Sequence, residues 1–126
     1  HLSLWVRTTA SLPDDRVVQR AILAYISDIS LMAGAVMPHL GSVPPGMVVN
    51  PASLDHAMWF HRTAEADRWM LYDQVSPNAS GLLGFSMGRP MQDGKLIASC
   101  CQEGVMRLMD ANDLDALVTF PFGRSE

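Results

Sequence analysis

Residues 21–37 read AILAYISDISLMAGAVM, and this stretch decides the fold. Apolar side chains would point to every side of a helix built from it, which is typical of a helix enclosed by other structure. Just before the stretch, Ser11 can cap a helix and Pro13 suits a first helical turn. Farther along, Gly34 weakens a helix and Pro38 ends it. The sequence therefore predicts one long buried helix.

The charged side chain inside this stretch belongs to Asp28. One helical turn away from it lie Ala24, Tyr25, Leu31 and Met32. An ionised carboxylate among apolar side chains costs several kcal/mol, so proteins rarely keep one that nothing uses. Asp28 is therefore a candidate functional residue. The alternative is that it lies at an exposed edge or caps a broken helix.

Alternating apolar and polar residues predict β-strands on both sides of the helix. The first strand covers residues 1–9, in which Leu2, Leu4 and Val6 share one face. Residues 39–51 are rich in glycine and proline and predict a loop. Further strands are predicted after the loop, at residues 52–62, 68–75, 82–91 and 96–108.

The segment Gln92-Asp-Gly-Lys95 predicts a tight hairpin turn before the last strand. That strand places four residues on one face: Leu96, Ala98, Cys100 and Gln102. The element order is strand, helix and then antiparallel strands. It predicts an α+β fold in which a curved antiparallel sheet wraps around one long buried helix. We expect residues 1–108 to form this single domain and residues 109–126 to form a C-terminal tail.

Composition narrows the possible functions. The chain has 126 residues and a net charge of −4, with no dense run of lysine or arginine, which argues against nucleic acid as the main partner. No apolar stretch reaches the length of a membrane span and no signal-peptide pattern is present, so no membrane is expected. The adjacent Cys100 and Cys101 predict reduced thiols, core residues rather than nucleophiles, and a cytoplasmic location.

A carboxylate, a hydroxyl and a carboxamide can together hold one water molecule for a hydrolysis. Asp28, Ser53 and Gln102 supply these groups: the carboxylate attracts the proton of the water, and the other two fix its orientation. No histidine is obviously paired with Ser53, so a serine-hydrolase triad fits poorly. Hydrolysis without a covalent intermediate fits better.

Several motifs resemble the C-terminal half of the acyl-CoA thioesterase II family, in order over residues 4–108. They are Leu12-Pro-Asp-Asp15, Tyr25-Ile-Ser-Asp28, Ser53-Leu-Asp-His-Ala-Met-Trp-Phe-His61, Gln92-Asp-Gly-Lys-Leu96 and Gln102-Glu-Gly-Val105. The resemblance implies the double hotdog fold and hydrolysis of fatty acyl-CoA to free acid and CoA. It also implies that Asp28, Ser53 and Gln102 activate water, without a cofactor.

Members of that family usually carry two hotdog units in one chain, whereas this chain resembles only the second. Pairing of two copies would restore the double unit, so we expect a homodimer or higher homo-oligomer. The alternative is a non-catalytic acyl-CoA-binding half that needs a partner hotdog chain for activity. A third hypothesis is a hotdog hydratase acting on enoyl-CoA. Such enzymes use an Asp/His pair at the start of the helix. No histidine lies near Asp28 in the sequence, so this hypothesis is the least favoured of the three.

Other polar residues have weaker predicted roles. Asp55 and His56 are expected to form hydrogen bonds at a strand end. His39 and His61 lack the spacing of a zinc site, so no metal is expected. Five basic residues are candidates for binding the CoA phosphates: Arg62, Arg68, Arg89, Lys95 and Arg107. The alternative for each of them is a solvated surface charge.

Overall fold

The computed structural model describes residues 1–113. Strand β1 (Leu2–Val6) precedes a helical segment made of α1 (Arg16–Ile29), α2 (Ala33–Val36) and the 3-10 helix η1 (Met37–Ser42). The remaining strands follow in this order: β2 (Met47–Ser53), β3 (Ala57–Phe60), β4 (Met70–Ser80), β5 (Leu83–Gln92), β6 (Lys95–Leu96) and β7 (Ala98–Asp110).

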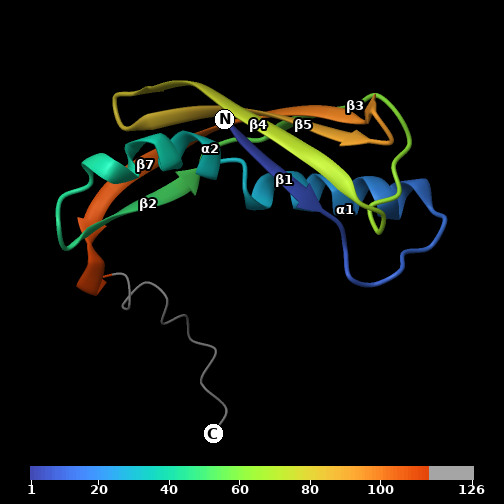
Figure 1. Ribbon diagram of the computed structural model, residues 1–126, viewed down its shortest axis with the longest axis horizontal. Coiled ribbons are helices and arrows are strands. Elements are labelled where there is room, and N and C mark those ends of the chain that lie inside the picture. Colours follow the sequence, from blue (N-terminus) through green and yellow to red (C-terminus); the bar gives the residue numbers. More distant parts are fainter. Residues whose placement is uncertain (114–126) are drawn as a thin grey trace, which may run out of the picture.

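All strands belong to one antiparallel sheet with the order β1-β4-β5-β7-β2, in which β6 pairs with β5 and β3 pairs with β7. The sheet curves over the helical segment, as Figure 1 shows. Strands β2 and β3 pair with successive parts of β7, so together they form one interrupted strand along the edge. The predicted α+β fold, a curved sheet around a helix, is confirmed.

Local patterns account for much of the sheet. The residues of β1 alternate between half-buried and exposed, as predicted for Leu2, Leu4 and Val6. In β7, Ala98, Cys100 and Gln102 are buried as predicted, whereas Leu96, expected on the same face of one strand, lies in β6 and is half-buried. The predicted hairpin is present: Gln92 pairs with Lys95, and Asp93 and Gly94 at its tip have φ of 50° and 73°. Positive φ at both central residues matches the right-handed twist of the flanking strands.

The start of the helix differs from the prediction. Asp15, and not Ser11, is the N-cap, and its carboxylate accepts hydrogen bonds from the backbone N–H groups of Val17 (2.7 Å) and Val18 (3.3 Å). Asp15 takes this role because its extended backbone stands directly before the first helical residue, Arg16.

The helical segment is neither continuous nor enclosed on all sides. It breaks between Ile29 and Ala33, before Gly34, and Pro38 lies inside η1 rather than ending a helix. Side chains spaced by four residues along α1 face away from the sheet and are exposed. We call them the α1 stripe: Val17, Ala21, Tyr25 and Ile29. Only the opposite face of α1, with Leu23 and Ser27, is buried.

The predicted loop at residues 39–51 and the predicted strand at residues 52–62 also need correction. Residues 47–53 form β2, and the strand is interrupted at Leu54–His56 before β3 begins. Glu103 of β7 holds this break: its carbonyl accepts from Leu54 N (2.9 Å), and its N–H donates to Asp55 Oδ1 (2.7 Å). Pro51 is tolerated inside β2 because β2 lies at the edge of the sheet.

The core lies between α1 and the concave face of the sheet. One cluster contains Leu23, Ala66, Met70, Ile97 and Ala98, and a second contains Leu31, Tyr72 and Cys100. Burial raises the pKa values of the Tyr72 hydroxyl and the Cys100 thiol above their ordinary values. Both cysteines are free thiols, and Cys100 is a core residue as predicted.

By length and composition alone, the stretch Arg16–Ser42 is apolar and long enough to cross a membrane. This finding corrects the expectation that no stretch reaches such a length. In the structure the stretch is interrupted, and part of it is buried inside the domain. Core helices of soluble proteins have the same composition, so the stretch is weak evidence for a membrane.

The end of the predicted domain falls within β7. Met109 and Asp110 follow the predicted boundary at residue 108 and pair with Val48 and Met47 in the sheet. Residues 114–126 of the predicted tail lie outside the described residues, so the division of the chain at residue 108 stays a prediction.

Gly88→Ala tests the packing of the core. A Cβ atom at position 88 would contact the hydroxyl of Tyr72 and lie 2.8 Å from Cys100 Sγ, and both side chains are buried. We expect the free energy of unfolding to fall by about 1–3 kcal/mol, measured by urea denaturation. Gly41→Ala is the control, because nothing lies within 4 Å of a Cβ atom there. Equal stability of the two variants would contradict this packing.

Candidate functional site

Asp28 and Gln102 meet at the C-terminal end of α1. Asp28 lies in the last turn of the helix and Gln102 in the middle of β7, and Gln102 Nε2 donates a hydrogen bond to Asp28 Oδ1 at 2.5 Å. The Gln102 side chain is buried, whereas that of Asp28 is 56% exposed. The expectation of a carboxylate enclosed by apolar side chains is therefore wrong. The alternative, an exposed edge near a helix break, is what the structure shows.

Ser53 lies near this pair but does not touch it. It is the exposed last residue of β2, and its register partner Gly104 is two residues from Gln102 along β7. Within residues 1–113 its hydroxyl makes no hydrogen bond. The structure thus brings Asp28 and Gln102 together, and it leaves the Ser53 hydroxyl without a hydrogen bond among residues 1–113, beside Gly104 in the middle of β7. The joint role of the three stays a prediction.

A row of buried polar side chains extends from Gln102 across the concave face of the sheet. Gln74 on β4, Ser86 on β5 and Gln102 on β7 are fully buried, and Ser86 is the register partner of Gln102. Gln74 Nε2 donates to Ser30 Oγ at 2.7 Å. Among the described residues, Gln74 Oε1, Ser86 Oγ and Gln102 Oε1 have no hydrogen-bond partner. Buried polar atoms without partners are rare, so three of them in one row are unusual for the core of a protein.

Sequence reasoning missed Gln74 and Ser86. The signal that could have found them is strand alternation: Gln74 continues the inward positions of Met70 and Tyr72 along β4. A polar residue at an inward position is a more informative observation than a polar residue on a surface.

Asp55 and His56 have different surroundings. Asp55 caps the break between β2 and β3 through Glu103 N–H, which is the structural role expected for it. His56 Nε2 lies 2.9 Å from Ser27 Oγ, and His56 Nδ1 lies 3.9 Å from Asp28 Oδ1. A histidine therefore does lie near Asp28 in space, contrary to what the sequence suggested.

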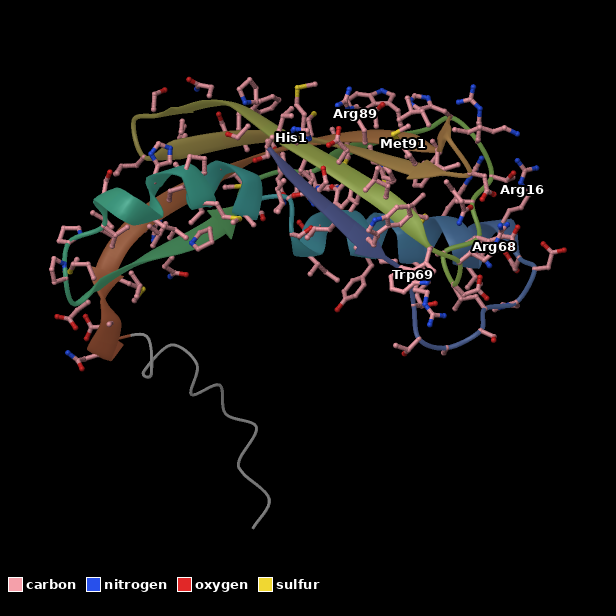
Figure 2. All side chains as sticks on the ribbon, in the orientation of Figure 1. His1, Arg16, Arg68, Trp69, Arg89 and Met91 are labelled. Carbon is pink, nitrogen blue, oxygen red and sulfur yellow. The ribbon has the colours of Figure 1, made fainter. Side chains whose placement is uncertain are left out.

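Three of the predicted phosphate-binding residues line one cleft of about 840 Å³ at the N-terminal end of α1: Arg62, Arg68 and Lys95. Arg16 and Arg20 of α1 line it as well, and Figure 2 shows Arg16 and Arg68 on the same side of the molecule. Arg68 is paired with Glu65 (3.1 Å) and Asp93 (3.3 Å). Arg20 lies eight residues before Asp28 on α1, or about 12 Å along the helix axis.

The other two predicted residues lie elsewhere. Arg89 forms an ion pair with Asp73, and Figure 2 shows it away from Arg16 and Arg68. Arg107 is exposed on β7 opposite Asn50 of β2. The structure therefore separates Arg89 and Arg107 from the cleft.

Metal ligands are not grouped in the described part of the chain. Residues 1–113 contain no group of three or more His, Cys, Asp or Glu side chains that could hold a metal ion.

Known proteins resemble this chain in sequence and in fold. The family model described as acyl-CoA thioesterase matches residues 1–105. Acyl-coenzyme A thioesterase 8 of Mus musculus is 42% identical over 106 residues, a match that covers 82% of this chain and 32% of that protein. The chain thus spans about a third of the length of this curated relative.

Solved structures agree with the family model. An acyl-CoA thioesterase II from Mycobacterium marinum is 41% identical, has a TM-score of 0.75, and is matched over 86% of this chain and 42% of its own. A hot-dog-like protein from Thermanaerovibrio acidaminovorans is 15% identical with a TM-score of 0.57, over 97% of this chain and 90% of its own, and shows the fold alone. The curved sheet and its helix are a hotdog fold, and the chain belongs to the acyl-CoA thioesterase family.

Proposed function

We propose that this chain carries the hydrolytic site of an acyl-CoA thioesterase, which releases free fatty acid and CoA. The observation that supports this most is the contact between Gln102 Nε2 and Asp28 Oδ1 at the end of α1, with the free Ser53 hydroxyl nearby on the adjacent strand. Family membership supports the thioester substrate.

In the proposed mechanism a water molecule attacks the thioester carbonyl directly. Asp28 accepts a proton from this water while Gln102 and Ser53 orient it. The new C–O bond gives a tetrahedral intermediate, the C–S bond then breaks, and the sulfur of CoA leaves with the electron pair. The proton held by Asp28 returns to this sulfur. No covalent acyl-enzyme forms, so no residue has to act as the nucleophile.

Asp28→Asn tests this mechanism. The amide keeps the shape of the side chain but cannot accept the proton, so we expect kcat for CoA release to fall by about 10²–10⁴-fold with an unchanged circular dichroism spectrum. The matched control is Asp110→Asn, at the far end of β7, which should keep the wild-type rate. Unchanged turnover in Asp28→Asn would contradict the mechanism.

We propose further that the cleft beside the N-terminal end of α1 binds the CoA phosphates through Arg62 and Lys95. The pantetheine arm of CoA separates the thioester from the phosphates, which suits a phosphate site displaced along α1 from Asp28. The ion pairs of Arg68 with Glu65 and Asp93 leave that guanidinium less available for a phosphate.

Lys95→Ala should raise KM for acyl-CoA by about three- to tenfold, with little change in kcat, because an exposed charge contributes modestly to binding. Arg107→Ala is the matched control outside the cleft and should leave KM unchanged. A short acyl thioester without the nucleotide should not distinguish Lys95→Ala from wild type. An effect of Lys95→Ala on that substrate too would argue against phosphate binding.

A second hotdog unit is the proposed partner. The α1 stripe exposes 68% of Tyr25 and 67% of Ile29, on either side of Asp28 in the sequence, and the sheet ends at an open strand edge. Apolar side chains and open strand edges of this kind are normally covered. The partner is a second copy of this chain or, as the alternative function, a separate hotdog chain without which this one only binds acyl-CoA. A cytoplasmic location stays a prediction.

Sedimentation of the purified chain tests the pairing of two copies. We expect a dimer, and we expect Ile29→Glu to convert it to a monomer because a buried charge would face the partner. Leu82→Glu, an equally exposed position in the turn before β5, is the control and should stay dimeric. A monomer that binds acyl-CoA without turnover would favour the alternative function instead.

A further inference from the structure

The tautomer of His56 follows from the bonds around Ser27. Ser27 Oγ lies 2.8 Å from the carbonyl oxygen of Ala24, which can only accept, and 3.7 Å from Met58 Sδ, a weak acceptor, so we assign the hydroxyl proton to the bond with Ala24. Ser27 Oγ also lies 2.9 Å from His56 Nε2. With this assignment, the ring nitrogen is the donor in the second bond. In the neutral ring, Nε2 carries the proton and Nδ1 is an acceptor.

That acceptor points toward the functional site. His56 Nδ1 lies 3.9 Å from Asp28 Oδ1, the same oxygen that accepts from Gln102. Nδ1 is buried and has no hydrogen-bond partner among residues 1–113. A buried acceptor without a donor is costly, so a donor is expected to reach it at some stage. A movement of the Asp28 side chain by about 1 Å would bring its carboxylate within hydrogen-bond distance of Nδ1.

The other titratable groups around His56 do not compete with Asp28. Tyr72 donates its hydroxyl to Ser27 O and contacts Cys100 Sγ, and burial raises the pKa of both groups, so both are neutral near pH 7. Asp55 is bound to Glu103 N–H. In the described part of the chain, Asp28 is the only acidic side chain within 4.0 Å of a His56 ring nitrogen.

We infer that His56 is the proton partner of Asp28 in the hydrolysis, an inference that rests on the proposed function. When Asp28 has taken a proton from the attacking water, its new O–H donates to His56 Nδ1 and the proton passes to the ring. The products of this transfer are an Asp28 carboxylate and a His56 imidazolium. After the C–S bond breaks, the proton returns through Asp28 to the sulfur of CoA.

His56 acts through Asp28, so it is a positioning residue with a proton-accepting role, and Ser27 fixes its ring. The simpler alternative is that His56 only forms a hydrogen bond with Ser27 and holds the segment between β2 and β3 in place. The two roles use different nitrogens of the ring: Nδ1 in the first case and Nε2 in the second.

His56→Gln separates these roles. The glutamine amide can keep a donor toward Ser27 but has no proton acceptor in place of Nδ1. We expect kcat to fall roughly 10- to 100-fold with KM nearly unchanged. The pH dependence of kcat should also change shape, whereas a structural loss would lower kcat equally at every pH. His61→Gln is the matched control, because His61 makes the same kind of bond to Ser99 Oγ (2.9 Å) away from Asp28, and it should keep wild-type kinetics.

Nitrogen-15 NMR of the imidazole rings gives a readout that does not depend on turnover. The neutral His56 ring should show a protonated Nε2, and Ser27→Ala should remove this preference. A neutral ring with the proton on Nδ1, or full kcat in His56→Gln, would overturn the inference while leaving the proposed function intact. If the wild type itself releases no CoA, while the NMR tautomer is as expected, the proposed function fails and the inference falls with it.

Discussion

The hydrogen bonds of Ser27 fix the position of the helix on the sheet, and the site depends on them. Ser27 is fully buried in the last full turn of α1. Its carbonyl accepts from Tyr72 of β4 at 2.8 Å, and its hydroxyl contacts His56 before β3. One helical residue is thus tied to the middle of the sheet and to its edge. Since Asp28 is the next residue, these bonds also set where the carboxylate lies relative to Gln102.

The features that the sequence predicts correctly are those that neighbouring residues determine. The alternation in β1, the inward face of β7 and the turn at Asp93-Gly94 each follow from short-range spacing or backbone preference. The meeting of Asp28 with Gln102 also followed, but from resemblance to a family rather than from spacing, since the two residues are far apart along the chain.

The features that the sequence does not predict depend on distant partners. The helix stops after Ile29, where Ser30 accepts a hydrogen bond from Gln74 of β4. Residues 47–51 form a strand because β7 offers a free edge, although Pro51 and nearby glycine suggest a loop. His56 lies near Asp28 because the break between β2 and β3 turns it toward α1. None of these partners is recognisable from local composition.

The sequence also does not show which basic residues are available to bind a phosphate. From sequence, Arg89 and Lys95 are equivalent candidates for a phosphate, yet one is held by Asp73 and the other lines the cleft. A guanidinium that already has a carboxylate partner gives up that interaction when it binds a phosphate, so its net contribution is small. Position and pairing, which only the fold supplies, decide which charge is available.

The exposure of Asp28 gives a physical reason for the second hotdog unit that we propose as the partner. In the proposed mechanism, solvent around this half-exposed carboxylate would weaken its interactions with the attacking water and with His56, because the effective dielectric constant is high. Covering the α1 stripe would exclude that water and strengthen both interactions without moving any residue. The described chain supplies the proposed proton acceptor Asp28, the buried amide of Gln102 and the mostly buried imidazole of His56 on one side of the site. A second unit that covers the α1 stripe would then contribute mainly by excluding water from that side of the site.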